Sequence, residues 1–305
     1  MVFMGTPDFA VPSLKILIEN GYPICAVVTA ADKPRGRGQD LSPTPIKRLA
    51  LNHHLSVLQP ASLKEPAFAE QIRSLAPDLI VVVAFRILPP DVFTIPRVGS
   101  FNLHASLLPR YRGAAPINWA IINGEKETGV TTFLLQEKVD KGNVLLQARI
   151  PIADDDDAGT IHDRLADVGA GIVLHTVRLL EQGKANPRVQ DELLASHAPK
   201  IFKDDCRITW SLPAERLRNF IRGLSPYPAA FSLHNGRVLK IYKSMVLPSP
   251  LTGPPGSVAV TRTSLAVATA DTMLNILELQ QEGKRRMGIE EFLRGYRIAS
   301  GEMLD

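Results

Sequence analysis

Short apolar runs alternate with amphipathic segments along the first 183 residues, and this alternation limits the possible fold more than any other feature. Runs that are apolar on both faces are typical of buried parallel strands. Strands are predicted at 1–4, 24–30, 79–84, 99–103, 130–135 and 144–152. Helices are predicted between them, at 11–20, 45–52, 66–75, 114–123 and 160–181. This order predicts a Rossmann-like α/β fold, a largely parallel sheet with helices on both faces.

The pattern changes after residue 184. Residues 185–205 contain Pro187 and Pro199 and show no sustained periodicity, as expected of a linker between domains. Beyond them, about five short strand-like runs and one helix predict a small β-barrel of the oligonucleotide/oligosaccharide-binding (OB) type. Asn235-Gly236 between two of these runs predicts a tight hairpin. We therefore expect an α/β domain, a linker and an OB-like barrel, spanning 1–184, 185–205 and 206–305.

The basic charge of the chain is concentrated in the predicted barrel. Residues 206–305 contain 13 Lys and Arg against 8 Asp and Glu, whereas the preceding 205 residues contain 22 against 23. A basic domain beside a neutral one suggests a polyanionic partner such as nucleic acid, although a solvated basic surface is an equal alternative.

Other sequence features restrict the class of protein. The two cysteines, Cys25 and Cys206, predict no disulfide framework, and no apolar run reaches the roughly 18 residues of a membrane span. The N-terminus lacks a secretory signal and opens directly into an apolar strand, so we expect a short lead-in to be missing. The acidic run 154–157 is interpreted as a solvated turn rather than a cation site, because no further ligands lie at metal-binding spacing. Thr160 is expected to cap the following helix.

Asn102 and His104 are the strongest candidates for chemistry. In an extended strand these residues project from one face, near the strand's carboxyl end, where open parallel sheets bind ligands. An amide donor beside an imidazole suits a reaction that passes through an oxyanion. An isolated pair of this kind is more often a turn residue and a core histidine.

Asp140 lies in a predicted loop between two strands. A carboxylate beside His104 would favour its cationic form or accept a proton, but an Asp before a Gly turn is also a common loop. Arg35 and Arg37 lie in a cationic loop that suits phosphate contact or plain solvation. Residues 5–9 follow a strand without a GxGxxG or P-loop pattern, which disfavours a nicotinamide dehydrogenase.

Together these segments resemble the methionyl-tRNA formyltransferase family along nearly the whole chain. The matching motifs are Met4-Gly5-Thr6-Pro7-Asp8-Phe9-Ala10-Val11, the loop from Arg35 to Lys47, Asn102, His104, Ser106-Leu107-Leu108-Pro109, residues 111–117, Asp140, and Pro226-Tyr227-Pro228. The chain departs from the family at Ala84–Pro89, which is one residue shorter beside the expected pterin pocket. It also has Gln39 and Asp40 where relatives often carry lysines, and Tyr227 where Trp is common.

The resemblance implies transfer of a formyl group from 10-formyltetrahydrofolate to methionyl initiator tRNA, without a metal. The missing secretory signal, membrane span and disulfide framework predict a cytoplasmic protein, and we expect a monomer. The resemblance also implies that Asn102, His104 and Asp140 are catalytic. Ser106, Leu107, Leu108 and Pro109 would contact the folate, and Arg35 and Arg37 the tRNA. One alternative is a formyltransferase acting on a small amine, either glycinamide ribonucleotide or a sugar nucleotide, but such an enzyme needs no basic barrel. The other is a non-catalytic nucleic-acid-binding protein, which would leave Asn102, His104 and Asp140 without a shared task.

Overall fold

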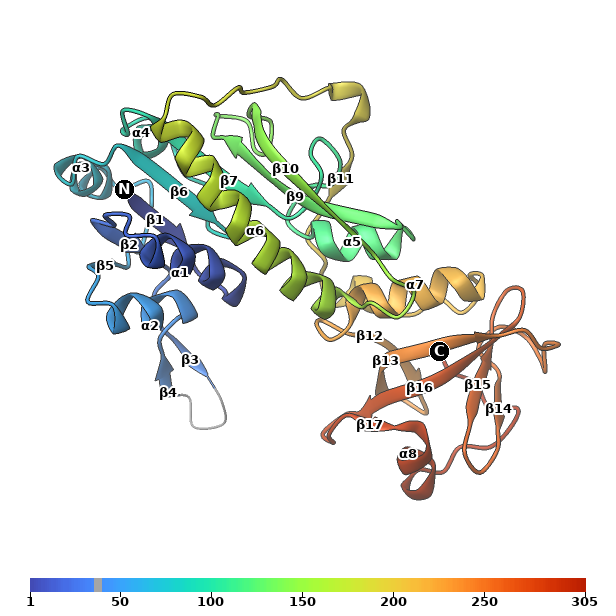
Figure 1. The fold of residues 1–305 in the computed structure, drawn as a ribbon. Coiled ribbons are helices and arrows are strands. Elements are labelled where there is room, and N and C mark those ends of the chain that lie inside the picture. Colours follow the sequence, from blue (N-terminus) through green and yellow to red (C-terminus); the bar gives the residue numbers. More distant parts are fainter. Residues whose placement is uncertain (36–39) are drawn as a thin grey trace. The chain divides into compact units, whose positions relative to one another are not determined.

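The computed structural model describes residues 1–35 and 40–305 (Figure 1). The chain forms two compact units, each assembled from segments that are separate in sequence. Unit 1 comprises Met1–Gly113, Thr128–Ile150 and His162–Ala198, and unit 2 comprises Ala114–Glu127, Pro151–Ile161 and Pro199–Asp305. In the described residues, no helix has the length and apolar character needed to cross a membrane.

A seven-stranded sheet forms the centre of unit 1, in the order β10-β9-β7-β6-β1-β2-β5. Its strands are β1 (Val2–Gly5), β2 (Ala26–Val28), β5 (Val57–Leu58), β6 (Leu79–Val83), β7 (Gly99–His104), β9 (Glu127–Leu134) and β10 (Val144–Pro151). From β7 to β5 all neighbours are parallel, and β9 is antiparallel to β7. The Rossmann-like expectation is confirmed, with β5 as a short strand that the sequence pattern did not reveal.

Apart from one short helix, Pro90–Phe93, which the sequence pattern did not reveal, the helices lie close to the predicted positions. They are α1 (Val11–Glu19), α2 (Pro45–Asn52), α3 (Pro66–Ser74), α4 (Pro90–Phe93), α5 (Pro116–Ile122) and α6 (Ala158–Glu181), with a 3-10 turn η1 (Asp8–Ala10) before α1. One face of the sheet buries Val2, Met4, Ile80 and Val82 against α3 and α4. Figure 1 shows α1 and α6 over the other face. There Leu103 reaches to within 2.7 Å of a Cβ placed on Gly169, so residue 169 of α6 must be very small.

The start of α6 differs from the expected one. Asp157, not Thr160, caps the helix: Oδ1 of Asp157 accepts from the Thr160 N–H at 2.8 Å, and Oγ1 of Thr160 accepts from the Asp157 N–H at 2.9 Å. This reciprocal pair satisfies main-chain donors that the first turn leaves without partners. The acidic run therefore contributes a helix cap, which the solvated-turn interpretation missed.

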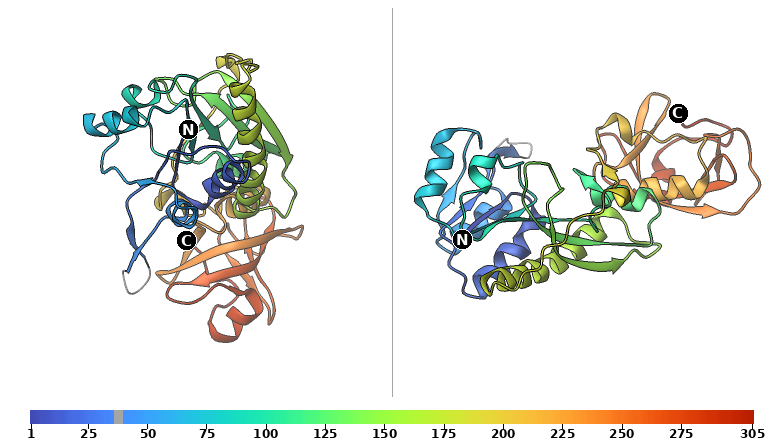
Figure 2. Two further views of the ribbon diagram at one scale, coloured as in Figure 1. Left: turned by 60° about the vertical axis from the view of Figure 1, so that its left-hand side comes forward. Right: turned by 90° about the horizontal axis from the view of Figure 1, so that it is seen from above.

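Unit 2 contains a curled antiparallel sheet, seen from further sides in Figure 2, in the order β12-β13-β16-β15-β14, with β17 pairing with β16. Its strands are β12 (Ala230–His234), β13 (Arg237–Leu247), β14 (Val258–Val260), β15 (Leu265–Ala268), β16 (Met273–Gln281) and β17 (Met287–Gly288). They enclose one apolar core with α7 (Ala214–Leu224) and α8 (Ile289–Gly295). The Asn235-Gly236 hairpin is confirmed: both residues have positive φ, 50° and 75°, as a type I′ turn requires.

Several short elements complete the fold. The strands β3 (Lys33–Arg35) and β4 (Asp40–Ser42) pair with each other in an antiparallel hairpin. The strands β8 (Arg112–Gly113) and β11 (His197–Ala198) pair in parallel within unit 1. Two 3-10 turns, η2 (Glu192–Leu194) and η3 (Asp204–Cys206), lie in or beside the segment that the sequence suggested as a linker.

Candidate active site

Asn102 and His104 lie on the face of β7 opposite to α6, because Leu103 between them points towards that helix. His104 is the last residue of the strand and is 6% exposed, whereas Asn102 is half-buried. The Asn102 side chain forms no hydrogen bond with any other residue that the structure describes. Its amide is therefore available as a donor to a bound molecule.

The orientation of the His104 ring is set by a main-chain carbonyl. Nε2 of His104 lies 2.8 Å from the carbonyl oxygen of Tyr111. A carbonyl oxygen only accepts hydrogen bonds, so Nε2 must carry a proton. Tyr111 has a φ of 60°, a left-handed conformation that is uncommon for a bulky residue and that aims its carbonyl at the ring.

Asp140 reaches His104 from the loop between β9 and β10. Its Oδ2 lies 3.9 Å from Nδ1 of His104 and accepts the N–H of Gly113 at 2.9 Å. Strand β9 ends at Leu134, which pairs with Phe101 of β7. Phe101 lies three residues before His104, so the loop after β9 must fold back along the sheet for Asp140 to reach His104. The Asp140 φ of 54° supports this reversal.

Two glycines allow the main chain to approach closely here. A Cβ on Gly142 would lie 1.6 Å from the carbonyl oxygen of Leu134, which no side chain permits. A Cβ on Gly113 would lie 2.5 Å from the carbonyl oxygen of Ala198 in β11, and Gly113 has a φ of 126°. The loop that carries Asp140 and the segment that binds it therefore both depend on glycine.

A network of side chains supports the loop that carries Asp140. Arg112, 5% exposed, donates to Oε1 of Gln190 and forms a bidentate pair with the carboxylate of Glu192. Gln190 in turn donates to the main-chain carbonyls of Asp140 and Gly142. Arg112 is thus committed to protein partners rather than to an anionic ligand.

The charge of Glu192 is stabilised by two cations. Hydrogen bonds from Arg112, and then from Lys141, lower the pKa of Glu192 from its ordinary value of 4.5 to about 2. The carboxylate itself is exposed, so solvent and salt screen these pairs.

The hydroxyl groups of Ser106 and of Thr131 in β9 hold the main chain of the loop after β7. The Ser106 hydroxyl, fully buried, donates to the carbonyl oxygen of Arg110 at 2.6 Å. Thr131 accepts the Leu108 N–H and donates to the Ser106 carbonyl. Leu108 packs in a core cluster, whereas Leu107 and Pro109 are only half-buried. Contacts of these four residues with folate stay a prediction.

The predicted phosphate-binding loop is described only in part. Arg37 lies outside the described residues, and Arg35 is described as the last residue of β3. Lys47 of α2, which follows the β3–β4 hairpin, donates from Nζ to Oδ2 of Asp32 at 2.6 Å and to Oε1 of Gln59 at 2.7 Å. Contact of Arg35 and Arg37 with tRNA stays a prediction.

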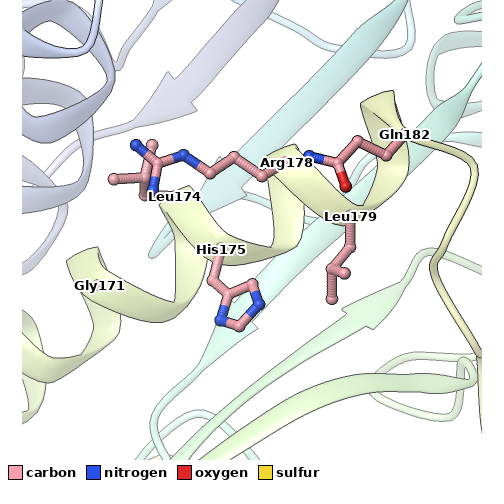
Figure 3. Close-up of a pocket in the computed structure, with 6 residues that line it drawn as sticks. All are labelled: Gly171, Leu174, His175, Arg178, Leu179 and Gln182. Carbon is pink, nitrogen blue, oxygen red and sulfur yellow. The ribbon is translucent and has the colours of Figure 1, made fainter.

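A separate depression of about 360 Å³ runs along α6 (Figure 3). Its lining comes from successive turns of that one helix, namely Gly171, Leu174, His175, Arg178, Leu179 and Gln182. None of these residues belongs to the His104 site. Among the described residues, no group of three or more His, Cys, Asp or Glu side chains is arranged to hold a metal ion.

Reasoning from the sequence missed the supports of the site. Gln190, Arg112 and the Tyr111 carbonyl hold His104 and Asp140, but Gln190 lies 50 residues beyond Asp140. The available signal was a polar Gln190-Asp191-Glu192 run in a stretch assigned to a linker. Composition gives no reason to place that run beside a loop so distant in sequence.

Comparison with known proteins yields matches along nearly the whole chain. Residues 1–177 match the family described as formyl transferase, and residues 200–297 match its C-terminal domain. A methionyl-tRNA formyltransferase of Caldanaerobacter subterraneus subsp. tengcongensis is 50% identical over 306 residues, covering 100% of this chain and 99% of the relative.

Solved structures share the fold at low sequence identity. An N-formyltransferase from Helicobacter canadensis, in complex with folinic acid and dTDP-3-aminofucose, superposes with a TM-score of 0.68 at 20% identity, covering 92% of this chain and 98% of that one. A methionyl-tRNA formyltransferase from Clostridium thermocellum superposes with a TM-score of 0.57 at 13% identity, covering 92% and 97%.

Proposed function

The chain belongs to the formyl transferase family, and from that membership we infer that it transfers the formyl group of 10-formyltetrahydrofolate to the amino group of methionyl initiator tRNA. The observation that carries this inference is the match with methionyl-tRNA formyltransferases over the full length of both chains. The protein is accordingly an enzyme of one-carbon metabolism and translation initiation. We further propose that the enzyme acts in the cytoplasm, as a monomer.

We propose that Asn102 and His104 stabilise the negative charge that develops on the formyl oxygen. The methionine amine attacks the formyl carbon, a new C–N bond forms, and the bond to the folate nitrogen breaks. The free amide of Asn102 suits the developing oxyanion. In His104, Nε2 is occupied by the Tyr111 carbonyl, so Nδ1 is the ring nitrogen that serves the reaction.

Asp140 acts on the proton that the attacking amine must lose. Its Oδ2 lies 3.9 Å from Nδ1 of His104, beyond hydrogen-bond distance but within reach of an ion pair. A protonated Nδ1 can donate to the oxyanion, and the Asp140 carboxylate can accept the proton that the amine loses. That proton then balances the one needed by the departing folate nitrogen. Metal chemistry is not part of this proposal.

The folate is proposed to bind beside the carboxyl ends of β7 and β6. Ser106 and Leu108 would act by fixing the shape of the loop, since both are buried among protein groups. Leu107 and Pro109, which are half-buried, would form its surface towards the folate. The one-residue-shorter stretch Ala84–Pro89, which follows β6, borders the same region.

Recognition of tRNA is proposed to involve Arg35, Arg37 and the basic residues of 206–305. We retain the functional division into a catalytic domain 1–184, a linker 185–205 and an OB-like tRNA-binding domain 206–305. The two family matches, at 1–177 and 200–297, support this division. The structure adds that Ala114–Glu127 and Pro151–Ile161 pack with the C-terminal segment as unit 2.

The decisive experiment offers labelled 10-formyltetrahydrofolate to the protein together with charged initiator tRNA, and separately with glycinamide ribonucleotide and an amino-sugar nucleotide. We expect formyl transfer to methionyl-tRNA at a kcat/KM at least about 10³-fold above that for either small amine. Efficient transfer to a small amine with none to tRNA would replace this function with that of a small-molecule formyltransferase. No transfer to any of them would favour a binding protein.

A further inference from the structure

All hydrogen-bond partners of the Gln190 side-chain amide lie within unit 1. Gln190 is 7% exposed, and Nε2 donates to the carbonyl oxygens of Asp140 at 2.8 Å and Gly142 at 2.7 Å. Oε1 accepts from Nε and Nη2 of Arg112, at 3.1 and 2.7 Å. A side-chain amide has two donor hydrogens and two acceptor lone pairs, so all four positions are occupied. A flipped amide would place oxygen against two carbonyls, and the orientation is therefore fixed.

The loop that Gln190 holds has a main chain that needs support. Asp140 has a φ of 54°, and Gly142 passes so close to the Leu134 carbonyl that no Cβ fits. Left-handed conformations of non-glycine residues persist where the surroundings over-determine them. The two bonds from Gln190 bracket this turn at its first and third residues.

The other side of the amide reaches the segment that orients the site. Arg112 stands between Tyr111, whose carbonyl accepts from His104, and Gly113, whose N–H donates to Asp140. The Arg112 side chain is buried and held by Gln190 and Glu192. Gln190 therefore connects the loop carrying Asp140 with the residue between the two main-chain groups that bind the catalytic side chains.

We propose that Gln190 is a positioning residue that sets the separation between Asp140 and His104. It acts through the main chain of the 140–142 turn and through Arg112, without touching the substrates. This proposal rests on the formyl-transfer function inferred above. If Gln190 only stabilised the fold, its replacement would lower stability and leave turnover unchanged. As a positioning residue, it affects turnover through the placement of Asp140.

The variant Gln190→Glu separates the two sides of the amide. A carboxylate still accepts from Arg112, but it places oxygen where Nε2 donated to two carbonyls. We expect kcat for methionyl-tRNA formylation to fall by about 10- to 100-fold, with KM for both substrates within about twofold, since small misplacements of catalytic groups cost this much. Gln190→Met removes the donors without adding charge and should lower kcat in the same way. Val189→Ala truncates the neighbouring side chain, which is 83% exposed, and should leave kcat unchanged.

A double-mutant cycle provides the test. In an Asp140→Asn background, measured in single turnover, Gln190→Glu should lower the rate by less than about threefold, because the group through which it acts is already gone. A full additional loss in that background, or an unchanged kcat in the single variants, would overturn the proposal. Failure of both variants to fold would also count against it, by making Gln190 a folding residue.

The wild-type assay separates this inference from the proposed function. If the wild-type protein does not formylate methionyl-tRNA, the function itself fails. If it does, and Gln190→Glu remains fully active, only the role of Gln190 is wrong.

Discussion

His104 donates from Nε2 to the main-chain carbonyl oxygen of Tyr111 over 2.8 Å, while its Nδ1 faces Asp140 at 3.9 Å. The first contact fixes the tautomer, because a carbonyl has no proton to offer. The second is too long for a hydrogen bond, so Nδ1 is not committed to Asp140. One ring nitrogen therefore orients the side chain, and the other is the nitrogen to which we assign the catalytic role.

Removing either side chain of this pair should lower turnover without loss of the fold. We expect His104→Ala and Asp140→Asn each to reduce kcat by about 10²- to 10⁴-fold, the usual cost of losing an acid–base group or oxyanion donor. Asp140→Asn keeps an oxygen that can accept the Gly113 N–H, so its loop should stay in place. Steady-state formylation assays measure the effect, with circular dichroism to verify folding. A variant with near-wild-type kcat would show that its residue is structural.

Asn102 should be more sensitive to charge than to truncation. Its amide is without a hydrogen-bond partner among the described residues, so Asn102→Ala removes the donor that we propose for the oxyanion and little else. We expect that variant to lose about 10²- to 10³-fold in kcat. Asn102→Asp should be slower still, because its carboxylate repels the forming negative charge. Equal rates for the two variants would argue against an oxyanion beside this residue.

The sequence predicted the strand–helix order, the hairpin at Asn235-Gly236 and the placement of Asn102 and His104 on one strand face. These features follow from local periodicity and turn chemistry, which can be recognised within a few consecutive residues. It did not predict that Gln190 holds the Asp140 turn, because that contact joins residues 50 positions apart and depends on how the chain returns along the sheet. Asp157 was missed as a helix cap because a Thr three residues later fits the same local pattern.

Gly113 should tolerate no side chain. It has a φ of 126°, and a Cβ at this position would lie only 2.5 Å from the Ala198 carbonyl oxygen, so we expect Gly113→Ala to destabilise the protein by about 2–4 kcal/mol. The N–H that binds Asp140 would move as well, so kcat should fall. The matched control is Gly183→Ala, which has a φ of 64° but open space around the Cβ and should cost about 1 kcal/mol with unchanged kcat. Denaturant unfolding and kcat measure the two effects, and similar results for both variants would contradict the predicted clash.

The ion pairs of Glu192 should make a pH-dependent contribution to stability. The pKa of Glu192 is depressed in the folded protein, to about 2 from an ordinary 4.5. Its stabilising effect is therefore fully present above pH 4.5 and is lost as the pH falls through that value towards 2. The midpoint of urea unfolding should be higher for wild type than for Glu192→Gln at about pH 7, and the difference should shrink at about pH 4 and pH 3. High salt should also reduce it, because the carboxylate is exposed. A difference independent of pH would show that the charge is not the source of the stabilisation.

Binding of tRNA should depend on salt through cations of both predicted tRNA-contacting regions. Each phosphate neutralised releases counterions and contributes about 0.7 to 0.9 log units of affinity per log unit of salt. We expect Arg37→Ala to raise KM for methionyl-tRNA while leaving KM for the folate unchanged.

In unit 2, Lys284 and Arg285 are exposed in the turn between β16 and β17, and replacing both with Ala should flatten the salt dependence of tRNA affinity. Point variants are preferable to truncation at residue 205, because truncation would uncover α5, which packs against α7 within unit 2. Lys15→Ala removes an exposed cation of α1 and serves as the control with an unchanged slope. If affinity proves insensitive to salt in the wild-type protein, phosphate contacts do not hold the tRNA, and a small-amine substrate becomes the better interpretation.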